Sequence, residues 1–349
     1  MSEQMAGPAL DTAVDPPRRY VNPIPEEGDN GVYSQSWFVL CMSTELLADV
    51  PKRCDFLGGK VVAYRDASGQ AHCVSAYCPH LGADLACGKV LGNHLQCAFH
   101  HWEFAPTGRC VRTAIGEKPP PHARLFVFPV KEKYGLVWAF NGHAPLWDLP
   151  NFNAPHDDES RLIWDVQRRD PPFMCSPWVF CCNTLDFQHS IAVHGVTLSE
   201  EMISGLHKRV RWNEFGFDYD REAAHQGGIP ISWQLGIRGT SFFWQQGTYD
   251  GFWFGFVTGF SLPRAGINDV YLAVAVEADS TSADDQALAR RRLEIAMALE
   301  VRTIEEDRPI VSHARFAPGH LIRADRSMAQ FFDYLRRYPR QHPSKPFIQ

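Results

Sequence analysis

The sequence predicts an α+β protein, in which an N-terminal domain built only of β-strands precedes a domain that combines strands with a long C-terminal helix. Two observations in its 349 residues lead to this prediction. In the first part of the chain, short apolar runs are separated by Gly, Pro and Asn, which is typical of small antiparallel β domains. In the second part, longer strand-like runs precede a segment with apolar residues at helical spacing. The chain is long enough for two domains.

The predicted domains follow changes in composition along the chain. Residues 1–30 are rich in Pro, Asp and Glu and poor in apolar side chains, so we expect a loose N-terminal arm there. We expect the β domain at residues 31–145 and the second domain at residues 146–349. Prolines at positions 145, 150 and 155 indicate a linker between them. The clearest strands of the first domain are residues 37–40, 61–64 and 135–140.

The second domain is expected to open with a helix and to close with a longer one. Ser176 and Pro177 offer an N-cap followed by Pro at the first helical position, and Gly195 offers a stop, so a helix is expected between them. Strands are expected between residues 204 and 277, and a long helix over residues 284–311.

Composition narrows the function classes. The net charge of −6 gives no electrostatic reason to expect nucleic acid or an anionic membrane as a partner. No apolar run approaches the roughly 20 residues of a membrane span, and the first residues do not resemble a signal peptide. The ten Cys are therefore expected to be reduced thiols, some of them metal ligands, in a cytoplasmic protein.

Two short motifs in the first domain carry four candidate metal ligands. Cys78 and His80 form a C-x-H pair, and Cys97 and His100 form a C-x-x-H pair. In a Rieske [2Fe–2S] centre, two Cys thiolates hold one iron and two His imidazoles hold the other. A structural zinc site is the alternative, although zinc fingers usually pair like residues with like. The mixed pairs favour a Rieske cluster, and hence electron transfer.

A second candidate metal site lies on the first helix of the second domain. His189 and His194 stand near Asp186, and two His with one carboxylate is the ligand set of mononuclear non-haem iron enzymes that use O₂. On an ideal helix the two His lie roughly 140° apart, so the helix must loosen or end between them. Asp186, one turn before His189, can face the same side. Two unrelated His on a partly buried helix is the alternative.

The third ligand is expected from the long C-terminal helix, where Glu305, Glu306 and Asp307 are adjacent. Projected at about 100° per residue, only Asp307 falls within the apolar stripe of this helix. An acidic side chain on an apolar face needs a partner such as a metal ion. We therefore predict Asp307 as the third ligand and read the other two acids as a solvated cluster.

Together these motifs resemble those of the α subunit of Rieske non-haem iron oxygenases, from about Trp37 onward. The cluster motif is C-P-H followed by C-x-x-H-H-W, and the mononuclear-iron motif is N-x₂-D-x₂-H-x₄-H. The chain departs from the family at Ala98, where many members have Pro. Asn183, where some members have an acid, is compatible with the homotrimeric, monooxygenase-like branch.

The resemblance implies a fold, two cofactors and an assembly. The fold would be a Rieske domain followed by a helix-grip catalytic domain, an antiparallel sheet with a long C-terminal helix. Asp186 would bridge His100 of one subunit and His189 of the next in a homotrimer. The implied ligands are Cys78, His80, Cys97 and His100 for the [2Fe–2S] cluster, and His189, His194 and Asp307 for a mononuclear Fe(II).

The activity implied by the resemblance is that of a terminal oxygenase. O₂ is the co-substrate, and electrons come from NAD(P)H through a separate reductase or ferredoxin. The substrate is an aromatic or bulky apolar small molecule, oxidised by a monooxygenase rather than a ring cis-dihydroxylating dioxygenase. A Rieske electron carrier with a non-catalytic binding domain and a zinc-organised binding protein are the alternatives. The aromatic stretch 242–260 is a candidate pocket lining, with Gln245, Gln246 and Tyr249 as polar candidates.

Overall fold

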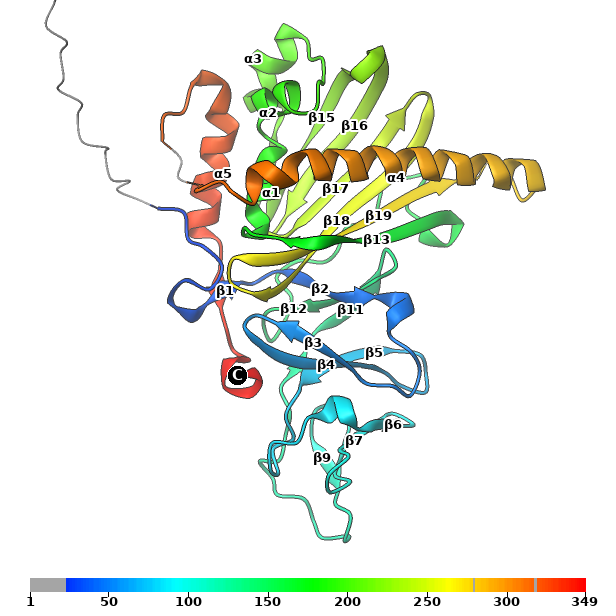
Figure 1. Cartoon of the computed structure of the whole chain (residues 1–349), viewed down its shortest axis with the longest axis vertical. Helices are drawn as coiled ribbons and strands as arrows, with labels where there is room; N and C mark the ends of the chain where they lie inside the picture. Colours follow the sequence, from blue (N-terminus) through cyan, green and yellow to red (C-terminus); the bar gives the residue numbers. More distant parts are fainter. Residues whose placement is uncertain (1–22, 279, 317–318) are drawn as a thin grey trace, which may run out of the picture.

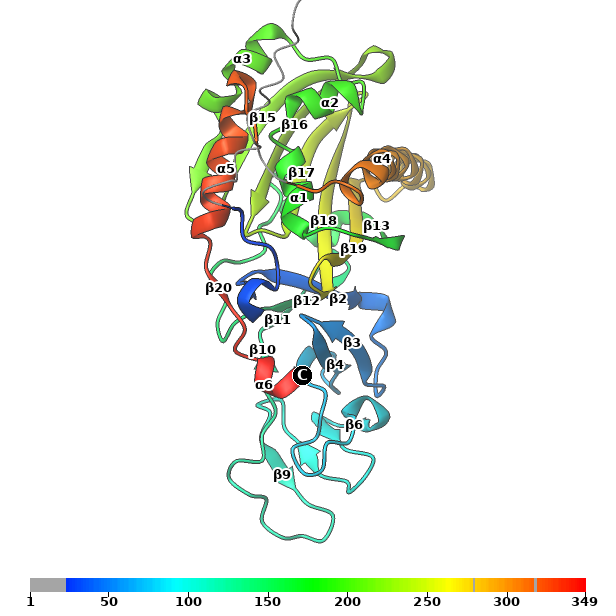
Figure 2. The same ribbon diagram turned by 60° about the vertical axis from the view of Figure 1, so that its left-hand side comes forward.

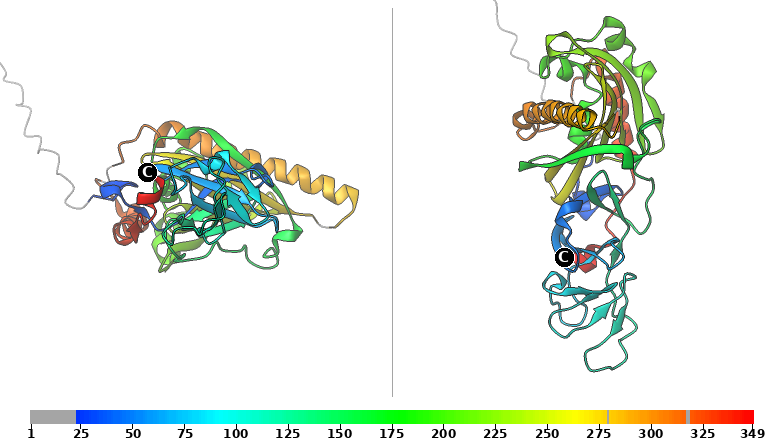
Figure 3. Two further views of the ribbon diagram at one scale, coloured as in Figure 1. Left: turned by 90° about the horizontal axis from the view of Figure 1, so that it is seen from below. Right: turned by 90° about the vertical axis from the view of Figure 1, so that its right-hand side faces the viewer.

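The computed structural model describes residues 23–278, 280–316 and 319–349. The molecule is elongated, with the strands up to β12 at one end and the elements from β13 to α5 at the other (Figures 1 and 3). A β domain followed by an antiparallel sheet with helices confirms the predicted fold class. β12 ends at Phe140 and β13 begins at Leu162, so the predicted boundary at 145/146 falls in the connecting segment.

The first domain contains three small antiparallel sheets. Their strand orders are β10-β5-β4-β3, β11-β12-β2 and β6-β7-β8-β9. The last of these sheets, at the far end of the molecule, carries the loop of the second Cys/His motif (Figure 1). The strands are β2 (Trp37–Met42), β3 (Lys52–Phe56), β4 (Gly59–Arg65), β5 (Ala71–Ser75), β6 (Lys89–Leu91), β7 (His94–Gln96), β8 (Glu103–Phe104), β9 (Cys110–Arg112), β10 (Val127–Phe128), β11 (Val130–Lys133) and β12 (Leu136–Phe140).

The second domain is built on one seven-stranded antiparallel sheet in the order β13-β19-β18-β17-β16-β15-β14. The long helix α4 (Ala283–Val311) packs against this sheet and agrees with the predicted helix to within one residue at its start. The strands are β13 (Leu162–Phe173), β14 (Arg211–Asn213), β15 (Gly216–His225), β16 (Ile229–Arg238), β17 (Phe242–Tyr249), β18 (Phe252–Arg264) and β19 (Ile267–Glu277).

The predicted helix between residues 176 and 195 is wrong in its continuity. Two short helices stand there, α1 (Pro177–Asn183) and α2 (Phe187–Ala192). Neither Gly nor Pro lies at the break; instead the side chain of Asp186 accepts a hydrogen bond from the His189 N–H and starts a new helix. The expected strand region is also wrong at its beginning, because residues 204–209 belong to the helix α3 (Glu200–Arg209).

Strands β18 and β19 are buried on both faces of the large sheet, which explains their nearly continuous apolar sequence. Alternate residues point in opposite directions along each strand. Phe242 and Trp244 pack with Trp138 and other first-domain side chains, whereas Phe243 and Phe256 face the core beneath the helices. Gly259 permits this close packing, since a Cβ there would lie 2.5 Å from the Trp138 ring.

Both ends of the described chain pack onto the domains. In the predicted loose arm, residues 1–22 lie outside the described residues, but residues 23–30 are not loose, because Glu27 is buried and accepts hydrogen bonds from the backbone and hydroxyl of Ser34. After α5 (Arg326–Arg337), β20 (Arg340–Gln341) pairs with β1 (Tyr33–Ser34), and α6 (Lys345–Ile348) returns to the first domain (Figure 2). Among the helices that the structure describes, none combines the length and apolarity needed to cross a bilayer.

Candidate metal centres and substrate cavity

Two loops of the first domain bring together the four side chains of the Cys/His motifs. Cys78 and Cys97 are buried, whereas His80 is exposed and His100 is half-buried. The centroids of the His80 and His100 rings lie 4.6 Å apart. The His80 ring also stacks on Trp102 at 4.3 Å, with 6° between the ring planes. The sulfur ligands therefore lie inside the domain and the imidazoles at its surface.

Tight backbone turns produce this division. The N–H of Cys78 donates to the carbonyl of Ala83 at 2.9 Å, and the N–H of Gly82 donates to the carbonyl of Cys78 at 2.8 Å. In the second loop, the N–H of Cys97 donates to the carbonyl of Trp102 at 2.9 Å. Each loop thus folds back on itself and holds its Cys beneath its His.

This arrangement fits a Rieske cluster. Burial raises the pKa of the Cys78 thiol to about 12, and the neighbouring Cys97 thiol adds to the effect. The Cys78 thiol therefore needs a metal to become a thiolate, because coordination removes the proton. Two buried sulfurs opposite two accessible imidazoles match the unequal ligands of the two irons in a Rieske centre.

In the second domain, the turn after α2 brings two His rings together at nearly a right angle, with 81° between the ring planes. α2 ends at Ala192, between His189 and His194, as the sequence required, and Gly195 follows with φ +62°. The Nε2 atoms of the two rings lie 3.0 Å apart. The predicted stop at Gly195 is therefore displaced, because the C-cap of α2 is Val193 and Gly195 lies beyond the end of the helix.

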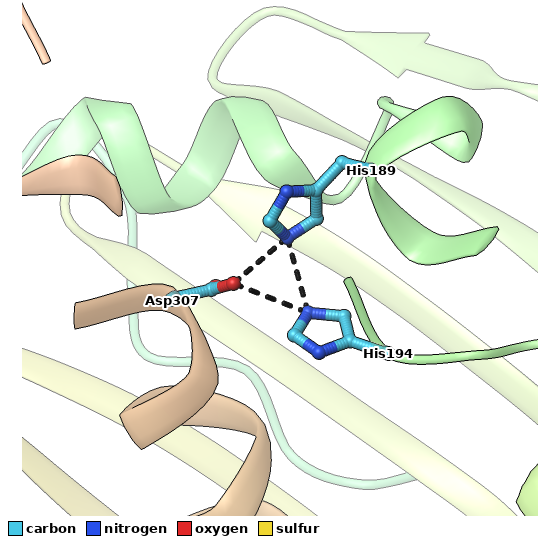
Figure 4. Close-up of side chains that lie close together, drawn as sticks. All are labelled: His189, His194 and Asp307. Carbon is cyan, nitrogen blue, oxygen red and sulfur yellow. Dashed lines mark hydrogen bonds and ion pairs between the residues drawn. The ribbon is translucent and has the colours of Figure 1, made fainter. Parts of the chain in front are cut away.

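Asp307 of α4 completes a triangle with these rings. Its Oδ1 lies 2.9 Å from Nε2 of His189 and 3.2 Å from Nε2 of His194 (Figure 4). Ligands that meet at a right angle on bonds of about 2.1 Å lie about 3.0 Å apart. The three atoms thus fit one face of an octahedral ion, the arrangement of two His and one carboxylate in non-haem Fe(II) enzymes.

Asp307 itself is almost fully buried, at 4% exposure. Burial alone would raise the pKa of this carboxyl, but the His189 and His194 rings beside it outweigh burial and lower the pKa. Its Oδ1 is buried and has no hydrogen bond of regular geometry among the described residues. An ionised carboxylate in this position is what a metal ion would require.

The other two acids of the cluster differ from each other. Glu305 pairs with Arg169 and Arg308, away from the triad. Glu306 does not behave as the solvated acid that the sequence predicted, because its Oε2 lies 2.8 Å from Nδ1 of His194. A carboxylate at Nδ1 keeps the proton on that nitrogen and leaves Nε2 free for a metal.

Asn183, whose role the sequence left open, contacts the triad directly. Its Nδ2 donates to Oδ2 of Asp307 at 3.2 Å. This bond orients the carboxylate so that Oδ1 faces the two imidazoles. Asn183 and Glu306 therefore support the ligands from two sides, as partners behind metal ligands commonly do.

A cavity opens beside the triad and is lined mainly by apolar side chains. It comprises about 790 Å³ of space between protein atoms, its open mouth included. From the aromatic stretch 242–260, the inward-facing residues Phe243, Gln245 and Phe256 contribute to the lining. Gln246 and Tyr249 are not among the described lining residues, so only one of the three predicted polar candidates faces the cavity.

Three ionisable lining residues were missed by sequence reasoning: Arg221, His225 and Glu300. Glu300 is buried, and burial raises the pKa of its carboxyl to about 8 despite a hydrogen bond from Nε2 of Gln245 at 3.1 Å. The only signal in the sequence was a polar residue on the inward face of an otherwise apolar strand or helix. That signal is weak because the cavity is formed by elements far apart in the chain.

Comparison with known proteins bears on the first domain most directly. The family model described as the Rieske [2Fe-2S] domain matches residues 36–128. The chain carries a Rieske domain. This match supports the expected [2Fe–2S] cofactor and argues against a structural zinc site at the Cys/His motifs.

The comparisons also cover the second domain. The chain is 36% identical over 213 residues to cholesterol 7-desaturase nvd of Bombyx mori, covering 57% of this chain and 45% of that protein. It is 29% identical over 126 residues to the oxygenase component of 3-ketosteroid-9-alpha-monooxygenase of Rhodococcus rhodochrous, covering 36% and 30%. The curated relatives are matched over 27% to 51% of their own length.

Among solved structures, NdmB of Pseudomonas putida CBB5 superposes with a TM-score of 0.68 at 18% identity, over 90% of this chain and 93% of that one. At this identity the match establishes the shared fold. Domain content and fold together confirm the resemblance to Rieske non-haem iron oxygenase α subunits.

Proposed function

We propose that this chain is the terminal component of an oxygenase that uses O₂ to oxidise a small apolar molecule, as a monooxygenase. Electrons arrive at the cluster held by Cys78, His80, Cys97 and His100 and are used beside the triad of His189, His194 and Asp307. The observation that carries the proposal is the triangle of ligand atoms at an apolar cavity, in a chain with a Rieske domain. Monooxygenation is favoured because several relatives are named monooxygenases.

The Fe(II) held by the triad would supply binding and reduction of O₂. The protein residues supply the rest. Glu306 holds a proton on Nδ1 of His194, and Asn183 fixes the Asp307 carboxylate. Aromatic walls exclude water from the substrate and hold it next to the triad, which limits the reaction to the bound molecule.

A separate electron donor is part of the proposal. Several relatives are named as oxygenase components, which implies that a reductase or ferredoxin works with them. The 349 residues contain no Gly-x-Gly-x-x-Gly fingerprint for a dinucleotide. NAD(P)H would therefore be oxidised on another polypeptide, which passes electrons to the exposed His80 side of the cluster.

Assembly as a homotrimer would bring the two centres of neighbouring chains together. Within one chain they lie at opposite ends of the molecule (Figure 1), so contact between His100 and Asp186 needs a second copy. Oδ1 of Asp186 is used by the His189 N–H, whereas Oδ2 has no hydrogen-bond partner among the described residues. That free oxygen supports the proposed role of Asp186 as a bridge.

Metal analysis tests the proposal. The purified chain should contain about three iron atoms and two acid-labile sulfides per chain. Its visible spectrum should change on reduction, and substrate should trigger O₂ uptake when a reductase is supplied. A preparation with the cluster but with no further iron, even after reconstitution with Fe(II), would instead identify an electron carrier.

A further inference from the structure

A buried arginine in the cavity lacks the partner that its charge requires. Arg221, on β15, is 7% exposed and lines the cavity. Its Nε and Nη2 atoms are buried and form no hydrogen bond, and no described carboxylate lies within 4.0 Å of it. The guanidinium carbon lies 5.7 Å from the centroid of the Phe187 ring. The one polar side chain that interacts with Arg221 among the described residues is the neutral hydroxyl of Tyr219, which itself donates to the carbonyl of Thr184. Because arginine stays protonated, this buried charge needs explanation.

A second unpartnered donor stands beside it. Trp233 of β16 pairs with Arg221 across the β15–β16 ladder, so the two side chains are neighbours on the same face of the sheet. Trp233 lines the same cavity, and its Nε1 is buried without a hydrogen-bond partner. Two residues on adjacent strands that line one cavity thus carry three N–H donors with no hydrogen-bond acceptor among the described residues.

We propose that Arg221 and Trp233 bind a carboxylate of the substrate, so that the substrate class is apolar carboxylic acids. Nε and Nη2 form one edge of the guanidinium, the edge that holds both oxygens of a carboxylate in parallel hydrogen bonds. The apolar walls would take the remainder of the molecule. This inference rests on the proposed function, since it takes the cavity beside the triad to be the substrate site.

The surrounding charges favour a monoanion over a phosphate. Arg221 is the only Lys or Arg among the residues that line the cavity in the described parts of the chain. Nδ1 of His225 lies 3.3 Å from Nη2 of Arg302. Burial and the positive charge of Arg302 lower the pKa of the His225 ring, so this ring adds no positive charge at neutral pH. The single positive charge of Arg221 therefore balances one carboxylate. A phosphate dianion would keep one negative charge without a basic side chain to balance it.

Binding to matched probes tests the proposal. We would measure binding of 1-naphthoate, biphenyl-4-carboxylate and 4-cyclohexylbenzoate, and of their primary carboxamides, to the iron-loaded chain by anaerobic calorimetry. At least one acid should bind about 10-fold or more tightly than its amide, as expected for a charge-assisted double hydrogen bond. R221Q should abolish the preference, and R221K should retain part of it.

R238Q is the matched control, because Arg238 also lies on the sheet but is already paired with Asp218 and the carbonyl of Phe217, outside the cavity. It should keep the preference for acids. If no acid binds more tightly than its amide, or if R221Q keeps the preference, the proposal is overturned.

A stability measurement separates ligand binding from a structural role. If Arg221 is unpaired until substrate arrives, R221M should keep or raise the melting temperature by a few degrees, because it removes a buried unpaired charge. A fall of several degrees would make Arg221 a structural residue and overturn the proposal. Acid binding without O₂ uptake would instead remove the proposed oxygenase function and leave the carboxylate site standing.

Discussion

The two candidate metal centres are assembled in different ways. All four cluster residues come from two loops of one small domain, between Cys78 and His100 in sequence, and backbone turns hold them. The triad combines two His in and just after α2 with an Asp near the C-terminal end of α4. Six of the seven strands of the large sheet lie between these helices in the sequence. The first centre therefore depends on local turn geometry, whereas the second depends on the packing of the whole second domain.

The two centres also differ in electrostatic surroundings. The four candidate ligands of the cluster are two buried Cys and two more exposed His, and none of them is an acid. The triad lies in a cavity with a buried acid, a buried arginine and two supporting polar residues. Substitutions in the second domain should therefore affect the second centre strongly and leave the spectrum of the cluster unchanged.

The largest effect is expected from Asp307→Ala. Loss of one of three ligands should remove the mononuclear iron, so that iron content falls by about one atom per chain while sulfide stays constant. Substrate-dependent O₂ uptake should fall to the background level. Iron analysis, the visible spectrum and an oxygen electrode report these quantities. Loss of the cluster spectrum as well would show that the two centres do not fold independently.

Asp186→Asn should separate electron transfer from metal binding. Asn also caps helices well, so α2 should keep its start at this position. Both metals should stay bound, whereas turnover should fall by about 100-fold, because the proposed bridge between subunits loses its charge. Steady-state O₂ uptake and metal content would be compared with the wild type. Unchanged turnover would eliminate the bridging role and leave Asp186 as a helix cap.

The difference between the centres also explains what the sequence could predict. The Cys/His pairs are contiguous motifs, and Asp307 stands out as an acid on the apolar face of a helix, which the structure places beside both His rings. The break between α1 and α2 was not predicted, since no Gly or Pro marks it. Arg221 and Glu300 were missed because only the folded sheet shows that their side chains share a cavity. Glu306 was misassigned because an ideal helical projection ignores the reach of its side chain.

Glu306→Ala should weaken the second centre more mildly. Without the carboxylate at Nδ1, His194 loses the partner that fixes its ring and proton. The affinity for Fe(II) should fall by about 10-fold, the lower end of the range for such supporting residues. Competition with a chelator measures it. Glu305→Ala is the control, because Glu305 pairs with Arg169 and Arg308, and its removal should leave Fe(II) affinity unchanged.

Glu300→Gln should alter the pH dependence of stability and leave both metals in place. The pKa of Glu300 is raised to about 8 from 4.5, so the folded protein keeps a proton that the unfolded chain releases between these values. The free energy of unfolding of the wild type therefore falls as pH rises through this window, by up to about 3 kcal/mol at pH 7. Gln can still accept the bond from Gln245 but does not titrate.

Melting temperatures measured from pH 5 to 8.5 by tryptophan fluorescence would show this difference. The wild type and E300Q should agree near pH 5 and separate increasingly toward pH 8, with E300Q the more stable. Cluster absorbance, recorded in the same samples, should follow the same course in both proteins below the unfolding transition. Parallel pH profiles would mean that Glu300 is hydrated and ionises normally. Water would then reach the cavity beside the triad, in contrast to the burial of Glu300 in the structure.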